Sequence, residues 1–299
     1  MSIRFDPVTE GRAEEHADLD LRPTEELVEL MNDEDAKVAA AVRSAAPQLA
    51  AAIDAIVERL ERGGRLIYVG AGSSGRLALV DAAECGPTFG LRDGRVLAIV
   101  AGGPHAIATA QEAAEDDPDA GRADLLSRDI GPVDAVVAIS ASGTTPYVVG
   151  AARAAAQSGA LTVGLACTPD SELGALVEHE VVAVVGPELI AGSTRLKAGT
   201  AQKLMLNMIS TLTMVRLGKT YGNLMVDVVA SNAKLRARAK RAVALATDAS
   251  PAEVDSALDA ARGDVKVAIV SLLAGVGVDD ARIRLKASRG SVRRSLDGR

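Results

Sequence analysis

The stretch RLIYVGAGSSGRLALVDAAECGP, from Arg65 to Pro87, decides how the rest of the chain is interpreted. Its apolar run LIYV predicts a buried strand, which turns at Gly70-Ala71-Gly72 and continues as a helix headed by Ser73 and Ser74. Helix starts leave backbone N–H groups unpaired and carry a dipole that favours negative charge, and glycines let a phosphate approach the backbone. The stretch therefore predicts an anion site, although an ordinary strand-to-helix turn with a serine cap is the alternative. It is not a dinucleotide fingerprint, because no acidic residue ends a following strand to hold a ribose.

Apolar, β-branched runs alternate with helical stretches beyond this segment. The expected strands are 65–70, 96–101, 134–140, 161–166 and 180–185. The expected helices are 74–84, 104–127 with a break near Pro118, 145–157 and 171–178. This order predicts an α/β fold with a five-stranded parallel sheet flanked by helices on both faces. Sites in such sheets lie at the carboxyl ends of the strands.

Four segments divide the chain. Residues 1–62 form an N-terminal helical segment, in which Asn32 or Asp33 is expected to cap one helix and Pro47 to begin the next. Residues 63–218 form the sheet domain, and 219–249 a connecting helix. Residues 250–299, with Ser250-Pro251 and two glycine breaks, predict a small module of three helices of the ubiquitin-associated type.

A second hydroxyl cluster follows the third expected strand. Ser140, Ser142 and Thr145 lie within six residues, and Pro146 suits the first position of a helix, which makes Thr145 its N-cap. A polar turn with a capping threonine is the alternative for this cluster alone. Two such clusters at strand ends in one sheet together predict a phosphate held by hydroxyls and backbone N–H groups, without metal or lysine.

A third segment of interest is GPELIAGSTRLKAGTAQK, from Gly186 to Lys203. Three charged residues, Glu188, Arg195 and Lys197, lie near the start of a long helix that Ser193 or Thr194 can cap, and either the substrate or the solvent is their expected partner. The helix, which runs to about residue 216, is apolar nearly all round. It is therefore expected to be buried, and a subunit interface is one place where that would happen.

Composition excludes several classes of protein. The net charge is −7, aromatic residues make up 2% of the chain and tryptophan is absent, so nucleic-acid binding is not expected. The two cysteines, Cys85 and Cys167, have no metal-ligand spacing. No apolar run reaches 18 residues and the N-terminus lacks the apolar core of a signal peptide, so no membrane partner and a cytoplasmic location are expected.

Several motifs in order resemble one family. They include GAGSSGRLALVDAAECGPTFG at Gly70–Gly90, AGGPHAI at Ala101–Ile107, SASGTTPYV at Ser140–Val148 and YGNLMVD at Tyr221–Asp227. The strand ends resemble the sugar isomerase (SIS) fold, and the chain as a whole resembles the N-acetylmuramic acid 6-phosphate etherases. The GPE…GSTR…K block is also similar to glucokinase regulatory proteins, so that block alone does not separate an enzyme from a regulator.

The resemblance implies cleavage of the C3 lactyl ether of the phosphosugar, giving N-acetylglucosamine 6-phosphate and D-lactate. It implies two catalytic glutamates, Glu84 for protonating lactate and activating water and Glu115 for taking the C2 proton. The phosphate positions that it implies are Ser73, Ser74, Ser140, Ser142 and Thr145. Gly72, Glu188, Ser193 and Lys197 are further candidate contacts. No cofactor or metal is expected.

The resemblance also implies a homodimer that acts in amino sugar and N-acetylmuramate catabolism and in peptidoglycan recycling. Two other functions remain open at this point. A non-catalytic phosphosugar-binding regulator would keep the hydroxyl clusters without needing Glu84 and Glu115. An aldose–ketose isomerase on the same fold would use a similar C2 base, but nothing in that pattern predicts the ECGPTF segment.

Overall fold

The computed structural model describes residues 8–91, 93–109, 111–228 and 233–297. The chain forms two compact units. The first contains Met1–Ala83 and Gly94–Ser210, and the second contains Glu84–Asp93 and Thr211–Arg299. The boundaries predicted from sequence at residues 62, 218 and 249 remain a prediction.

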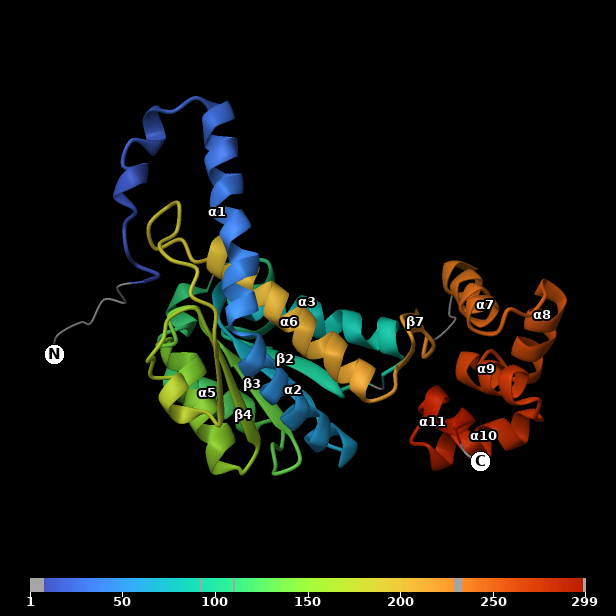
Figure 1. Ribbon diagram of the computed structural model, residues 1–299. Coiled ribbons are helices and arrows are strands. Elements are labelled where there is room, and N and C mark those ends of the chain that lie inside the picture. The colour runs from blue at the N-terminus through green and yellow to red at the C-terminus, as the bar shows by residue number, and fades with distance from the viewer. Residues whose placement is uncertain (1–7, 92, 110, 229–232, 298–299) are drawn as a thin grey trace. The chain divides into compact units, whose positions relative to one another are not determined.

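A parallel sheet of five strands forms the centre of the first unit, as predicted (Figure 1). Its strands are β1 (Leu66–Gly70), β2 (Val96–Val100), β3 (Ala135–Ile139), β4 (Leu161–Ala166) and β5 (His179–Val182). They pair in the order β2-β1-β3-β4-β5, with Gly70 opposite Ile139 where β1 and β3 end. The chain winds outward in both directions from β1 and β3, so their carboxyl ends form the switch point at which ligands bind in this class of sheet.

Helices cover both faces of the sheet, as predicted. α5 (Pro146–Gln157) buries its alanines and valines against β1 and β3, and α4 (Pro118–Leu126) packs against α5. The opposite face is covered by α2 (Ala46–Glu61) and by α3 (Gly72–Phe89), whose Asp81 accepts a hydrogen bond from Tyr68 of β1. Because both faces are covered, the central strands β1, β3 and β4 are buried along their whole length, whereas the edge strands β2 and β5 are only partly buried.

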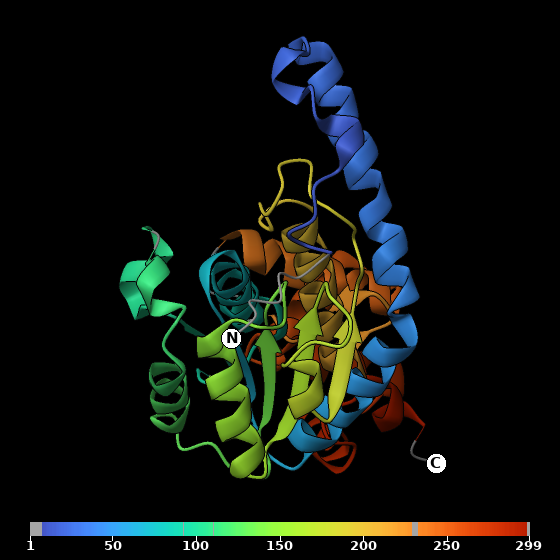
Figure 2. The same ribbon diagram turned by 90° about the vertical axis from the view of Figure 1, so that its left-hand side faces the viewer.

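The N-terminal helices differ from the prediction. Two short 3₁₀ helices, η1 (Glu14–His16) and η2 (Leu19–Leu21), precede α1 (Thr24–Ser44), which extends away from the sheet (Figure 2). The expected break at Asn32 or Asp33 was wrong, because both side chains lie on the exposed face of the uninterrupted helix α1. Capping residues are tolerated inside a helix where solvent satisfies their side chains.

The region between β2 and β3 is less helical than expected. Two short 3₁₀ helices, η3 (Gly103–Ile107) and η4 (Glu112–Ala114), replace the first part of the expected helix 104–127. Gly102 and Gly103 both have a positive φ, and Asp117 caps the N-terminus of α4 through Ala120 N–H, so the helix begins only there. Residue 110 lies outside the described residues. The expected helix 171–178 is reduced to η5 (Gly174–Leu176).

The second unit has its own apolar core, formed by the terminal helices and α7 (Ala233–Thr247). A short hairpin of β6 (Thr220–Tyr221) and β7 (Leu224–Met225) precedes α7 within the segment 219–249, and residues 229–232 of that segment lie outside the described residues. Within the described part, the terminal module has a fourth helix beyond the three predicted. The four are α8 (Pro251–Ala260), α9 (Val265–Ala274), α10 (Val278–Ala287) and α11 (Val292–Leu296). Ser291 caps α11 and Val292 is fully buried, which explains why so short a helix forms.

The long helix α6 (Lys197–Arg216) is not buried all round, in contrast to the expectation. Met208, Leu212 and Val215, at spacings of four and three residues, are 37%, 45% and 41% exposed, so one side of α6 presents an apolar stripe. In the part of the chain that the structure describes, no single helix is long and apolar enough to span a bilayer. Among the described helices, the pair α1 and α2, bent by 58°, passes that test by length and composition.

Candidate active site

A cavity of about 500 Å³ lies where β1 and β3 end, at the position that the sheet topology favours. Most of the predicted site residues line this cavity. They are Gly72, Ser73, Ser74, Glu115, Ser142, Thr145 and Ser193. Residues that lie more than a hundred positions apart in the sequence are thus brought together, and the volume suits a small ligand such as a phosphosugar.

The start of α3 forms one wall of the cavity. Gly72 adopts a left-handed conformation with φ +52°, and a Cβ atom at this position would lie 2.7 Å from Glu115 Oε1. The positive φ disfavours a side chain at this position, and any Cβ here would also displace the Glu115 carboxylate. The same geometry places the Glu115 carboxylate next to the first turn of α3, the helix end that the sequence predicts as an anion site.

The loop between β3 and α5 forms the facing wall. Ser140, 2% exposed, contacts Thr145 Oγ1 at 2.8 Å and accepts a hydrogen bond from Gly143 N–H at 3.0 Å. Ser142 Oγ accepts from the backbone N–H of Thr144 at 3.2 Å and from the Thr144 hydroxyl at 2.9 Å. Ser142 and Thr145 line the cavity, whereas Ser140 lies behind them and holds the loop in shape. Thr145 precedes α5 as predicted, but its hydroxyl pairs with Ser140 instead of capping the helix.

Glu115 is fixed to this loop through its backbone. Its carbonyl oxygen accepts a hydrogen bond from Tyr147 N–H at 3.0 Å, in the first turn of α5. Burial raises the pKa of the Glu115 carboxyl and the neighbouring Asp116 raises it further, whereas the Arg76 guanidinium lowers it. A partly buried carboxylate with a raised pKa, held inside a cavity, has the properties of a general base.

Glu84 is one of the predicted site residues that the structure does not place in this cavity. It is exposed and lies near the C-terminal end of α3, about three helical turns beyond the Ser74 end of the same helix. The described residues that line the cavity of the first unit do not include it. A carboxylate is also unfavourably placed for the dipole at this end of a helix.

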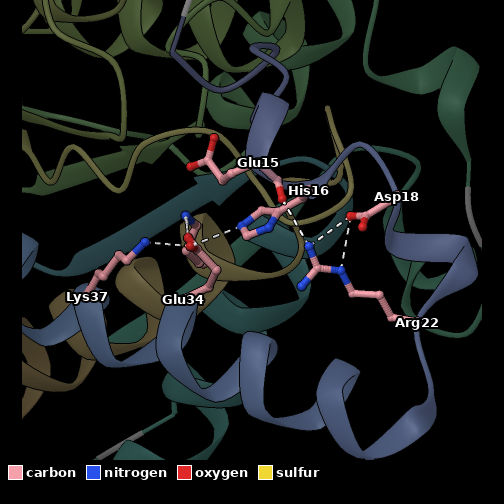
Figure 3. A network of polar contacts seen from close by, with 7 residues as sticks. Glu15, His16, Asp18, Arg22, Glu34 and Lys37 are labelled. Atoms are coloured by element: carbon pink, nitrogen blue, oxygen red, sulfur yellow. Dashed lines mark hydrogen bonds and ion pairs between the residues drawn. The ribbon is translucent and has the colours of Figure 1, made fainter.

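Glu188 and Lys197, two candidate contacts, support α6 instead of lining the cavity. The buried Glu188 carboxylate accepts the backbone N–H groups of Lys197 and Ala198 at 2.9 and 3.0 Å, and so caps α6. The buried Lys197 ammonium pairs with Glu34 of α1. Glu34 also pairs with Lys37 of the same helix and with His16, and the contact with His16 ties η1 to α1 (Figure 3). Burial raises the pKa of Glu34, but hydrogen bonds from Lys197, Lys37 and His16 outweigh it and bring that pKa to about 2.

Several charged residues that sequence reasoning did not place in the site also line the cavity. They are Glu10, Arg76 and Glu112. Arg195, which was a candidate together with Glu188 and Lys197, also lines the cavity. Arg76 Nε donates to the carbonyl of Ala106 at 2.8 Å, which holds the guanidinium near Glu115. Arg76 follows Ser74 by two residues in the stretch Arg65–Pro87, and this proximity to a predicted phosphate residue is the feature of the sequence that could have placed Arg76 in the site. In the described residues, no group of three or more histidine, cysteine or acidic side chains is arranged to hold a metal ion.

The fold and this site define the class of protein. A family model, the glucokinase regulatory protein N-terminal SIS domain, matches residues 48–156. A solved structure of a protein from Escherichia coli CFT073 has the same fold, with a TM-score of 0.50 at 16% identity over 68% of this chain and 97% of that chain. The first unit is therefore an SIS domain.

Full-length relatives identify the family within this class. A relative in Rubrobacter xylanophilus is 61% identical over 97% of this chain and 95% of its own length, and one in Streptomyces coelicolor is 56% identical over 96% and 93%. Both are named N-acetylmuramic acid 6-phosphate etherase, and a Vibrio cholerae relative, 48% identical over 97% and 94%, is named N-acetylmuramic acid 6-phosphate etherase 2. This chain belongs to the N-acetylmuramic acid 6-phosphate etherase family. A non-catalytic regulator is therefore not favoured.

Proposed function

We propose that the chain cleaves the C3 lactyl ether of N-acetylmuramic acid 6-phosphate to give N-acetylglucosamine 6-phosphate and D-lactate, a carbon–oxygen lyase reaction followed by addition of water. The observation that carries this proposal for the site is the Glu115 carboxylate, which lies against Gly72 in a cavity lined by hydroxyls. Release of D-lactate from the phosphosugar by the purified protein is the direct test, and its absence would contradict the proposal.

The chemistry explains why a base and an acid are needed. An ether is a poor leaving group, but opening of the sugar ring exposes an aldehyde at C1 that acidifies the C2 proton. A base removes this proton, and the electron pair of the C2–H bond forms the C2=C3 double bond as the C3–O bond breaks. An acid protonates the departing lactate oxygen. Water then adds to C3 and a proton returns to C2, so two carboxylates in different environments suffice.

We assign the C2 base to Glu115 and the acid that serves lactate and water to Glu84. The raised pKa of Glu115 supports the first assignment, because a stronger base takes a carbon-bound proton more readily. Glu84 is exposed on its own chain and lies at the far end of α3 from the cavity-lining serines. For both carboxylates to serve one site, we infer that Glu84 acts in the site of a second copy.

A homodimer is part of this proposal. The stripe of Met208, Leu212 and Val215 on α6 supports it, because exposed apolar side chains in line on a helix are typical of a surface that another subunit covers. The usual two-fold symmetry would give each dimer two equivalent sites. We place the reaction in the cytoplasm, in the catabolism of wall-derived amino sugars and in peptidoglycan recycling.

The phosphate belongs, in this proposal, between the start of α3 and the loop before α5. Ser142 supports this position, because its oxygen accepts two hydrogen bonds from Thr144 and its hydrogen faces only the Ser140 oxygen at 3.4 Å, a long contact that a phosphate oxygen can replace. Ser73, Ser74 and Thr145 line the same cavity. Ser140, buried behind Thr145, acts by holding the loop.

Ser142→Ala is expected to raise KM more than it lowers kcat, because the phosphate is remote from the bond that breaks. Loss of one hydrogen bond to a charged group corresponds to about 1.5–3 kcal/mol. Steady-state lactate release measures both constants. Ser158→Ala is the control, because the Ser158 hydroxyl donates to the Ala154 carbonyl at 2.9 Å and is not among the residues that line the cavity. An unchanged KM in Ser142→Ala would place the phosphate elsewhere.

Arg76→Gln is expected to move the acidic limb of the kcat/KM profile to higher pH. The positive charge of Arg76 lowers the pKa of Glu115, so its removal raises that pKa, and the base is then ionised only at higher pH. The profile of lactate release against pH measures the limb. Arg76→Lys keeps the charge and should leave the limb nearer its original position. The role of Glu115 as base would be contradicted if the acidic limb moved to lower pH in Arg76→Gln. It would also be contradicted if the limb moved equally in Arg76→Gln and Arg76→Lys.

A further inference from the structure

Gln202 lies in the second turn of α6, behind the cavity wall. Its side chain is only 1% exposed, and its Oε1 accepts a hydrogen bond from Ser74 Oγ at 2.8 Å. Its Nε2 is buried and has no hydrogen-bond partner within the described part of the chain. Buried amide donors are rarely left unpaired, so the unpaired Nε2 of Gln202 requires an explanation.

The direction of the bond between Ser74 and Gln202 conflicts with phosphate binding. A serine hydroxyl has one hydrogen, and here that hydrogen is directed to the Gln202 carbonyl. Ser74 then presents only lone pairs to the cavity, and the oxygens of an ionised phosphate are also acceptors. In this arrangement the Ser74 hydroxyl cannot donate to a phosphate.

Rotation of the Gln202 amide by half a turn removes the conflict. Nε2 then takes the place of Oε1 and donates to Ser74 Oγ, which frees the serine hydrogen for the phosphate. The amide oxygen moves to the position where Nε2 now has no partner, so each orientation leaves one amide group unpaired. Because the number of unpaired groups is the same, neither orientation is strongly preferred without ligand. A bound phosphate favours the orientation in which Nε2 donates to Ser74, because the Ser74 hydroxyl can then donate to the phosphate.

We propose that Gln202 is a positioning residue for phosphate recognition, whose amide turns over on binding and donates to Ser74 so that the Ser74 hydroxyl donates to the phosphate. This inference rests on the proposed function, which places the phosphate next to Ser74. Gln202 itself does not touch the ligand. The Gln202 amide and the Ser74 hydroxyl lie 128 residues apart in the sequence.

The test is a double-mutant cycle read by the inhibition constant of N-acetylglucosamine 6-phosphate and by kcat. Ser74→Ala should weaken inhibition about 10- to 100-fold, which corresponds to one hydrogen bond to a charged group. Gln202→Glu, which only accepts, should weaken it at least as much. Gln202→Met removes the donor but frees the serine hydrogen, so its loss should be smaller. In all three variants the inhibition constant should change more than kcat.

The Ser74→Ala background decides whether Gln202 acts through Ser74. There, Gln202→Met should change inhibition by less than about twofold. An equal loss with and without Ser74 would overturn the inference, as would full inhibition in Gln202→Met and Gln202→Glu. If Ser74→Ala alone leaves inhibition unchanged, the phosphate assignment of the proposed function fails instead. Thermal unfolding is measured for each variant, and Gln202→Met carries the test if the buried carboxylate of Gln202→Glu prevents folding.

Discussion

Glu115→Gln is expected to lose lactate release and to stop exchange of the C2 hydrogen with deuterated solvent. Glutamine keeps the size of the side chain but cannot act as a base near neutral pH. A positioned general base contributes about 10²–10⁴-fold, so the loss in kcat should lie in that range. Because Gly72 leaves room for the carboxylate and Tyr147 N–H holds its backbone, the amide should occupy the same place without disturbing the fold.

The measurement that isolates this step is proton NMR at C2 of N-acetylglucosamine 6-phosphate in deuterated water, because exchange requires no leaving group. Asp116→Asn is the matched control. Asp116 is adjacent in sequence, is not among the residues that line the cavity, and acts on Glu115 only by raising its pKa. It should retain both exchange and turnover. Exchange that persists in Glu115→Gln would assign the base to another residue.

The parts of this site that could be predicted from sequence are those set by local pattern. β-branched runs bounded by glycine located the strands, and parallel strands place their carboxyl ends at one edge. Ser73 and Ser74 at the end of β1, and Ser142 and Thr145 after β3, were therefore expected to meet, and they line one cavity. Helix boundaries were predicted less well where they depend on whether solvent satisfies the hydrogen bonds of a capping side chain. The helix α1 continues without the break that was expected.

The parts that could not be predicted depend on long-range partners. Lys197 was a candidate contact because it stands near the start of the long helix, yet it pairs with Glu34, which is 163 residues away. Charge type and spacing carry no information on which distant group will neutralise a buried ammonium. Gln202 was not singled out for the same reason, since an amide in a helix has no local pattern that reveals Ser74 as its partner.

Glu84→Gln is expected to lose lactate release about 10²–10⁴-fold while it still exchanges the C2 hydrogen. Its assigned steps, protonation of lactate and activation of water, come after the C2 proton has left. Exchange that persists in Glu115→Gln and vanishes in Glu84→Gln would reverse the two roles. Full turnover in both variants would remove these residues from the mechanism. The remaining question is which copy of the chain supplies Glu84 to a given site.

Mixing the two inactive variants answers it. If Glu84 acts in the partner's cavity, a dimer of one Glu84→Gln and one Glu115→Gln chain has one site with both changes and one intact site. With random pairing of equal amounts, about a quarter of the wild-type lactate release should return. If Glu84 acts in the cavity of its own chain, each site keeps one defect and no activity returns. Co-expression with two affinity tags isolates the mixed dimers, and dimers of each variant alone are the controls. Absence of recovery in purified mixed dimers would contradict the shared site. A site that takes Glu84 from the partner chain would have both carboxylates in one half of every mixed dimer and would therefore be active.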